Sequence, residues 1–421
     1  MQQLEKFKHT LPWLAAGLLC GSMVACGGGN TPLSSTGAQS SSNGQGNTAS
    51  LLAATVTSAP TPVSAQEGSP TLAQSQALSR FYSASSDPKQ ARFNGPQGIK
   101  LCSSGDLYVA DTRNFTIRKI TRDGVVTTFA GMPGIRGNAD GTGSGALFTE
   151  PRGITLDSAS NVYVTDGSVV RKITPSRVVK TIAGLQGAFG ETDGAGAAAR
   201  FDAPDGIVVD GAGNLFVADT DVSALTIRKI TRTGIVTTFA GGNTGGSTEL
   251  PHDDTGTKAS FVGPQGLAID QSNNLYVTDI GRGGLTAPNL YDGSSFVRKI
   301  SPGGVVKTVA GNFGFNTLPS GGPVAAFSVS TGIAVDASGN LFVVDHFNSS
   351  NRIKKIAPSG RISVLQVHPG NFGFISGIQV DSANNLFVTD INNSTITKVT
   401  QAGVVTVYAG KTGEAGSADT P

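Results

Sequence analysis

Six aspartates recur at one place in a repeated pattern, each at the end of a short apolar run such as "LYVAD" or "LFVAD". They are Asp111, Asp166, Asp219, Asp279, Asp345 and Asp390. Carboxylates are the ligands that hard cations prefer, but six to eight oxygens must converge at about 2.3–2.6 Å from the ion. An aspartate in such a turn can instead accept backbone N–H groups of its own unit. Because a unique site seldom needs six equal copies, we expect the structural role.

Three histidines follow the N-terminal region of the chain, and each lies in a segment that we expect to be a loop of a different unit: His252, His346 and His368. Three imidazoles can form an open zinc site that activates water. Their spacing contains no paired ligand motif, so the sequence requires no cofactor. A zinc or calcium site remains an alternative.

Other catalytic signals are missing from the sequence. It has no Gly-x-Ser-x-Gly elbow and no phosphate-binding glycine loop that opens a helix. Cys102 stands where other units have aspartate, and we expect it to be a structural substitution rather than a nucleophile.

Basic residues recur as pairs in strands of the type "IRKI", for example Arg118 with Lys119 and Arg228 with Lys229. We expect their aliphatic stems to lie along apolar surface with the charged heads in water, near the carboxylates of each unit. The charges are scattered and the formal net charge is only +2, which argues against a nucleic-acid partner.

The elements that carry these residues repeat every 45 to 66 residues, starting at Phe93, Phe148, Phe201, Phe261, Phe327 and Phe372. Each unit has four short apolar runs joined by Gly, Asn, Asp and Ser, which is typical of an antiparallel meander. Successive side chains of a strand point to opposite faces of the sheet, and in a run such as residues 215–218 the side chains of both faces are apolar. Both faces of each sheet must therefore be buried. The pattern predicts an all-β, six-bladed β-propeller with four antiparallel strands per blade.

The recurring segment "GNLFVADT…TIRKIT…VTTFAG", with "P.GI" at the start of each unit, resembles the NHL-repeat family over residues 91–410. The resemblance implies a six-bladed propeller. Lactonases on related propellers use an early Glu as a metal ligand, and "RFNGPQGI" has no Glu at that place.

Ring closure is predicted from the two ends of the repeat region. The tail "AGKTGEAGSAD" matches the front of the linker "AGLQGAFGETDGAGAAARF", and "ARFNGP" at residues 91–96 matches its back. We therefore expect the first and last blades to meet. Whether a strand is exchanged there stays open.

Antiparallel strands place the loops between second and third strands on the same face as the linkers between blades. These connections are longer and more varied than the hairpins opposite, so we expect ligand binding on their face. The longest such loop offers four candidate ligand-binding residues, Arg282, Asn289, Tyr291 and Asp292.

The N-terminus predicts export. A short apolar run after Lys6 and Lys8 ends in Met-Val-Ala-Cys26, which resembles a bacterial lipoprotein signal with lipidation of Cys26. We expect a signal peptide at residues 1–25, a flexible Ser/Gly/Thr-rich tether at 26–78 and the propeller at 79–421. The lipid would be the only membrane contact, in the cell envelope and at the outer membrane of a Gram-negative bacterium.

Together these features favour a non-catalytic binding module for a protein, peptide or glycan. The alternative is a metal-dependent propeller lyase or lactonase that uses the histidines.

Overall fold

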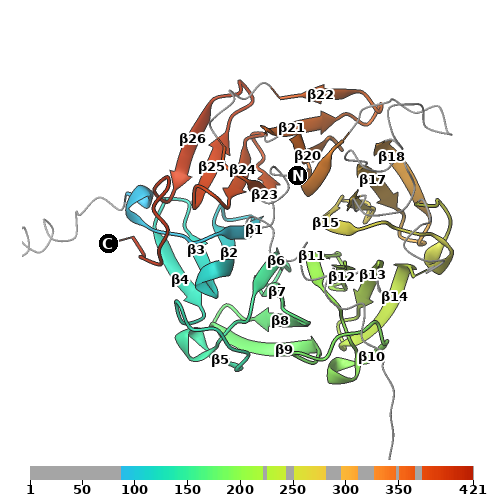
Figure 1. The fold of residues 1–421 in the computed structure, drawn as a ribbon, viewed down its shortest axis with the longest axis horizontal. Coiled ribbons are helices and arrows are strands. Elements are labelled where there is room, and N and C mark those ends of the chain that lie inside the picture. The colour runs from blue at the N-terminus through green and yellow to red at the C-terminus, as the bar shows by residue number, and fades with distance from the viewer. Residues whose placement is uncertain are drawn as a thin grey trace, which may run out of the picture. The chain divides into compact units, whose positions relative to one another are not determined.

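The computed structural model describes residues 87–220, 225–242, 251–280, 295–311, 327–347, 350–365 and 372–420. These residues form a six-bladed β-propeller, in which six antiparallel sheets stand around a common axis (Figure 1). The fold class predicted from the sequence is therefore confirmed.

Each blade is a meander whose first strand lies next to the axis and whose fourth lies at the rim (Figure 1). Blades one to three comprise β1 (Pro96–Leu101), β2 (Leu107–Asp111), β3 (Thr116–Ile120) and β4 (Val126–Ala130); β6 (Pro151–Leu156), β7 (Val162–Asp166), β8 (Val169–Ile173) and β9 (Val178–Gly184); and β11 (Pro204–Val209), β12 (Leu215–Asp219), β13 (Thr226–Ile230) and β14 (Ile235–Gly241).

Blades four to six comprise β15 (Pro264–Ile269), β16 (Leu275–Ile280), β17 (Ser295–Ile300) and β18 (Val306–Gly311); β19 (Val329–Val335), β20 (Leu341–Phe347), β21 (Ser350–Ile356) and β22 (Ile362–Val364); and β23 (Ile375–Val380), β24 (Leu386–Asp390), β25 (Thr395–Val399) and β26 (Val405–Ala409).

Short elements in the linkers complete the rim. The two-residue strands β5 (Gly141–Thr142) and β10 (Gly194–Ala195) pair with β9 and β14. Single 3-10 turns are η2 (Pro88–Gln90), η3 (Thr112–Asn114), η4 (Gly143–Gly145), η5 (Gly196–Ala198) and η6 (Gly256–Lys258).

The hairpin between first and second strands has the turn chemistry that the sequence predicts. In blade three the Asp210 carboxylate accepts the N–H of Ala212 at 3.0 Å and that of Asn214 at 2.7 Å. Gly213 adopts φ 82°, a conformation that glycine takes at little cost. Asp157, Asp270, Asp336 and Asp381 make the same bonds in other blades.

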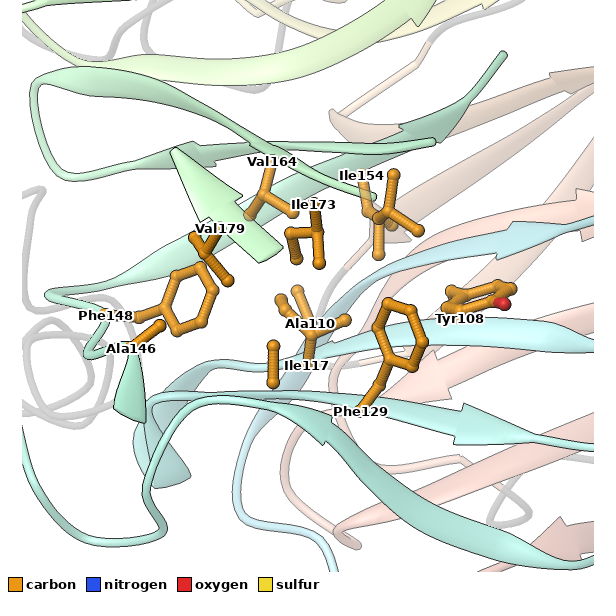
Figure 2. Close-up of a cluster of buried hydrophobic side chains, with 12 residues drawn as sticks. Tyr108, Ala110, Ile117, Phe129, Ala146, Phe148, Ile154, Val164, Ile173 and Val179 are labelled. Carbon is orange, nitrogen blue, oxygen red and sulfur yellow. The ribbon is translucent and has the colours of Figure 1, made fainter. Parts of the chain in front are cut away.

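The hydrophobic core lies between blades rather than inside any one of them. Between blades one and two, Tyr108, Ile117 and Phe129 pack against Phe148 and Ile154 (Figure 2). Equivalent clusters join every other neighbouring pair among the described strands, including blades six and one. Each sheet is thus covered on both faces, as the doubly apolar strands predict.

A glycine in each first strand lets neighbouring blades touch at the axis. A Cβ on Gly98 would lie 2.0 Å from the carbonyl oxygen of Arg152, and one on Gly206 would lie 2.2 Å from that of Gln265. The same contact recurs at Gly153, Gly266, Gly332 and Gly377. Gly377 of blade six meets the carbonyl oxygen of Gln97 in blade one, so the ring is closed.

The C-terminal tail completes blade one at this junction. Arg118 donates to the carbonyl of Ala418 and to the carboxylate of Asp419, at 2.9 and 2.7 Å. Thr420 donates its N–H to the carbonyl of Val126 in β4, as a linker does in other blades. Blades one and six each keep their own four strands, so the described residues exchange no strand there.

Candidate functional site

The aspartates that end the second strands are buried instead of facing solvent. In blade three the Asp219 Oδ1 accepts the N–H groups of Asp202 and Ala203 at 3.0 and 2.9 Å. The expected structural role is therefore confirmed, with one difference. The N–H donors lie mainly in the segment before the first strand, and Asp111 and Asp390 accept additional hydrogen bonds from the turn that follows them.

The expectation that the repeated arginines keep their heads in water is wrong. Arg228 is fully buried, and its guanidinium bridges Asp219 at 3.4 Å and the linker residue Asp193 at 2.7 Å. It also lies over the ring of Phe201, 5.3 Å from the centroid. Arg118, Arg171 and Arg298 repeat this arrangement in blades one, two and four.

These buried ion pairs join the linker, the second strand and the third strand of one blade. Burial raises the pKa of Asp219 to about 7 and that of Asp111 to about 6, although the guanidinium and the N–H groups favour the ionised form. Lys354 takes the cationic place in blade five, 2.6 Å from Asp345. The recurring charges are thus used to hold the fold.

A second set of recurring positions differs in type from blade to blade. The residue before each axial glycine is polar in all six blades: Gln97, Arg152, Asp205, Gln265, Thr331 and Ser376. We call these six the axial ring. Their backbones are neighbours because each axial glycine contacts the carbonyl oxygen of the next ring residue.

The axial ring lies near the face that carries the linkers and the loops between second and third strands, called here the loop face. Each ring residue lies at the start of its strand and follows the residue paired with the buried aspartate, as Asp205 follows Pro204, which pairs with Asp219. Ring carbonyls are fixed as well: Thr165 donates to Asp205 O at 2.8 Å, and Thr278 to Thr331 O at 2.7 Å.

Three charged residues of blades two and three gather at this ring. Arg152 donates from Nε and Nη2 to the same oxygen of Glu150, at 3.2 and 2.7 Å. Burial raises the pKa of Asp205, Arg152 opposes that rise and Glu150 adds to it. The Asp205 carboxylate accepts no hydrogen bond from the residues that the structure describes.

Sequence reasoning missed the axial ring. The signal was present in the six unit starts, where a varied polar residue stands before an unvarying glycine within an otherwise apolar strand, as in "PRGI" and "PDGI". An alignment of the units against one another at that column would have found it.

His346 lies at the end of β20, next to the axial ring. Its Nδ1 donates to the side-chain oxygen of Asn351, and its Nε2 accepts from the Thr331 hydroxyl at 3.2 Å. The imidazole stacks on Phe374 with centroids 4.1 Å apart. Burial lowers the pKa of His346 to about 4, so the ring is neutral at pH 7.

His252 is exposed, and its backbone pairs with Ser260 in the linker before blade four. His368 lies outside the described residues, as do the loop residues Arg282, Asn289, Tyr291 and Asp292 and the lipidation candidate Cys26. Their roles therefore stay predictions. Cys102 is half-buried, and its Sγ lies 2.8 Å from the Ser104 hydroxyl in the first hairpin of blade one.

Within the described ranges, no group of three or more His, Cys, Asp or Glu side chains is arranged to hold a metal ion. The same part of the chain contains no helix of the length and apolar character needed to cross a membrane.

Comparison with known proteins agrees with the repeat. Residues 93–120 match the NHL repeat family. NHL repeat-containing protein 2 of Bos taurus is 31% identical over 151 residues, which cover 32% of this chain and 20% of that protein. Teneurin-1 of Gallus gallus is 24% identical over 343 residues, covering 68% of this chain and 13% of the teneurin. The chain thus spans a small part of these relatives.

Solved structures with a similar fold include virginiamycin B lyase from Staphylococcus aureus, with 18% identity, a TM-score of 0.46, and coverage of 75% of this chain and 84% of the lyase. A gluconolactonase from Xanthomonas campestris has 14% identity and a TM-score of 0.46, with coverage of 71% and 84%.

The fold and the buried charge network define a six-bladed β-propeller built from a repeated ion-paired unit. The family match identifies residues 93–120 as an NHL repeat, as the recurring segment predicted, and the other five blades repeat its strand order.

The lowered pKa of His346 predicts a pH dependence of stability. Below the pKa of 6.5 in the unfolded chain, the unfolded state takes up a proton that folded His346 binds only near pH 4. Stability is therefore lost as the pH falls from 6.5 to 4. The free energy of unfolding in urea should be measured at pH 7 and at pH 4.5. Between these two pH values, wild type should lose about 2–3 kcal/mol more than His346→Gln.

The exposed His252 provides the matched control. His252→Gln should lose as much stability between the two pH values as wild type does. Equal losses in wild type and His346→Gln would contradict a buried, neutral His346.

Proposed function

We propose that the protein is a non-catalytic binding module that holds a protein ligand on its loop face. The observation that carries this proposal is the axial ring, where six positions related by the repeat are all polar and are of five residue types. Positions that serve the fold repeat their residue, as the buried aspartates do. Variation at one end of the axis is expected of a surface adapted to an asymmetric ligand.

Exposed apolar side chains on the same face support a protein rather than a glycan as the ligand. Phe189 in the linker after blade two is 68% exposed, and Leu185, Met132 and Ile135 of the linkers are also exposed. Large apolar side chains in solvent favour protein contacts, and aromatic residues are enriched in such interfaces. The loop at residues 281–294 remains the further predicted part of the binding surface.

Several groups that catalysis could use are engaged in the described structure. The repeated Asp and Arg residues form buried pairs, and both nitrogens of His346 take part in hydrogen bonds. A metal-dependent lyase or lactonase is therefore the less supported alternative.

We further propose that the propeller is exported and anchored in the cell envelope by lipid on Cys26, at the outer membrane of a Gram-negative bacterium. The support is the charged start, the short apolar run and the Met-Val-Ala-Cys motif. Residues 26–78 would then act as a tether with a root-mean-square length of about 35–45 Å, from ~5–6 Å × √n.

Lipidation is tested by metabolic labelling with an alkyne fatty acid in a bacterial host. The protein should incorporate the label, and Cys26→Ser should lose it because the acceptor thiol is gone. Cys102→Ser, which changes the half-buried cysteine of the propeller, should keep the label. Label retained on Cys26→Ser would rule out this anchor.

The binding face is tested by pull-down from a cross-linked envelope fraction. Replacing residues 282–294 by Gly-Gly, or changing Leu185 and Phe189 together to Ser, should reduce ligand recovery at least tenfold, because both changes remove contact surface from the loop face. The control changes Ile235 and Val404 to Ser. These residues are 47% and 54% exposed and lie in hairpins on the opposite face.

Recovery with the control should equal wild type. Normal recovery with both loop-face variants, or loss only with the control, would refute binding on the loop face.

A further inference from the structure

Asp205 differs from the buried aspartates of the fold in its position and its surroundings. It lies on β11 beside the axis, in the axial ring, whereas Asp219 of the same blade is locked by two N–H groups and Arg228. The backbone of Asp205 is fixed, because its carbonyl accepts the Thr165 hydroxyl and its neighbour Gly206 contacts Gln265. The carboxylate is thus held by a rigid strand.

The carboxylate has no partner among the described residues, although protein partly covers the side chain. It accepts no hydrogen bond and forms no ion pair with the residues that the structure describes. Burial disfavours its charged form, yet the residue keeps partial solvent exposure. A carboxylate with restricted access to water and no hydrogen-bond partner is unfavourable, and a ligand that supplies the missing partner would account for it.

The neighbouring charges determine which kind of ligand fits. Arg152 is the nearby cation, and it already gives two N–H groups to Glu150. With one Arg and two carboxylates, the group Glu150, Arg152 and Asp205 has a net charge of −1. An anionic ligand would be repelled by Asp205, whereas a cation would restore neutrality.

The next residue of the axial ring is an uncharged amide. Gln265 follows Asp205 around the ring, and its side-chain amide has no hydrogen bond to the described residues. A primary ammonium has three donors on one small atom, so it can bond a carboxylate and an amide oxygen on neighbouring blades. A calcium ion would need six to eight oxygens, and the described residues contain no metal-binding group.

We infer that the axial ring binds a primary ammonium group of the ligand, with Asp205 as the charged acceptor and Gln265 beside it. This inference rests on the proposed binding function of the loop face and gives it a chemical requirement. The ammonium belongs either to a lysine side chain of a protein ligand or to a free polyamine.

Calorimetric titration of the full chain in detergent tests the inference with two probes, Nα-acetyl-lysine amide and cadaverine. At least one should bind, and Asp205→Asn should weaken that binding at least tenfold. Raising the salt concentration should also weaken it, because the contact is charged. The uncharged analogue Nα-acetyl-norleucine amide should not bind.

The matched control is Asp123→Asn, which removes the same charge from an exposed hairpin on the opposite face and should leave binding unchanged. Binding of the lysine probe assigns the ammonium to a protein ligand, and binding of cadaverine alone assigns it to a polyamine.

Two outcomes would overturn the inference: no binding of either amine, or equal binding by Asp205→Asn and wild type, with both proteins showing the same circular dichroism spectrum and melting temperature. Either outcome would leave the pull-down test of the loop face unaffected, so failure of the inference is distinguishable from failure of the proposed function.

Discussion

A four-stranded sheet of this composition cannot shield both of its apolar faces, and this constraint governs the structure. Each described blade buries one face against the blade before it and the other against the blade after it. The chain therefore needs a closed ring in which every sheet has two neighbours. Closure also needs first strands that approach backbone to backbone, which the axial glycines allow.

The buried ion pairs fix the linkers to the blades, which packing between the blades does not do by itself. A guanidinium such as that of Arg228 joins an aspartate of the second strand to one of the preceding linker. At the ring junction the linker aspartate is replaced by Asp419 of the tail, which reaches Arg118 of blade one. The tail is thus a structural part of the first blade. Removing one partner of such a pair would leave a buried charge, which typically costs about 3–5 kcal/mol.

Residues that stabilise the fold can be distinguished from residues proposed to bind the ligand. Residues of the same type at equivalent positions in the blades form the core, the turns and the ion pairs. Residues that occupy equivalent positions but differ in kind lie in the axial ring, and the exposed apolar linker side chains lie on the same face. Asp205 and Gly206 show both classes side by side in one strand.

Much of the fold could be predicted from local patterns. Strand runs, Asp-based turns, doubly buried sheets and the shared linker at the ring junction all follow from residues close in sequence or related by the repeat. The burial of Arg228 could not be predicted in this way, because its second carboxylate, Asp193, lies 35 residues away in the linker. The engagement of His346 likewise depends on Thr331 and Phe374, which only the folded ring brings together.

The most direct test of this division is the free energy of unfolding, measured in urea at pH 7, for substitutions at two adjacent residues. Gly206→Ala should lose about 2 kcal/mol or more, because its Cβ would meet the carbonyl oxygen of Gln265 at 2.2 Å. Gly211→Ala, in the open hairpin of the same blade, is its control and should change little. Asp205→Asn should stay within about 0.5 kcal/mol of wild type or be more stable, since burial opposes the ionised carboxylate above its unfolded pKa. A large loss in Asp205→Asn, or none in Gly206→Ala, would contradict the assignment of one residue to the ligand and the other to the ring.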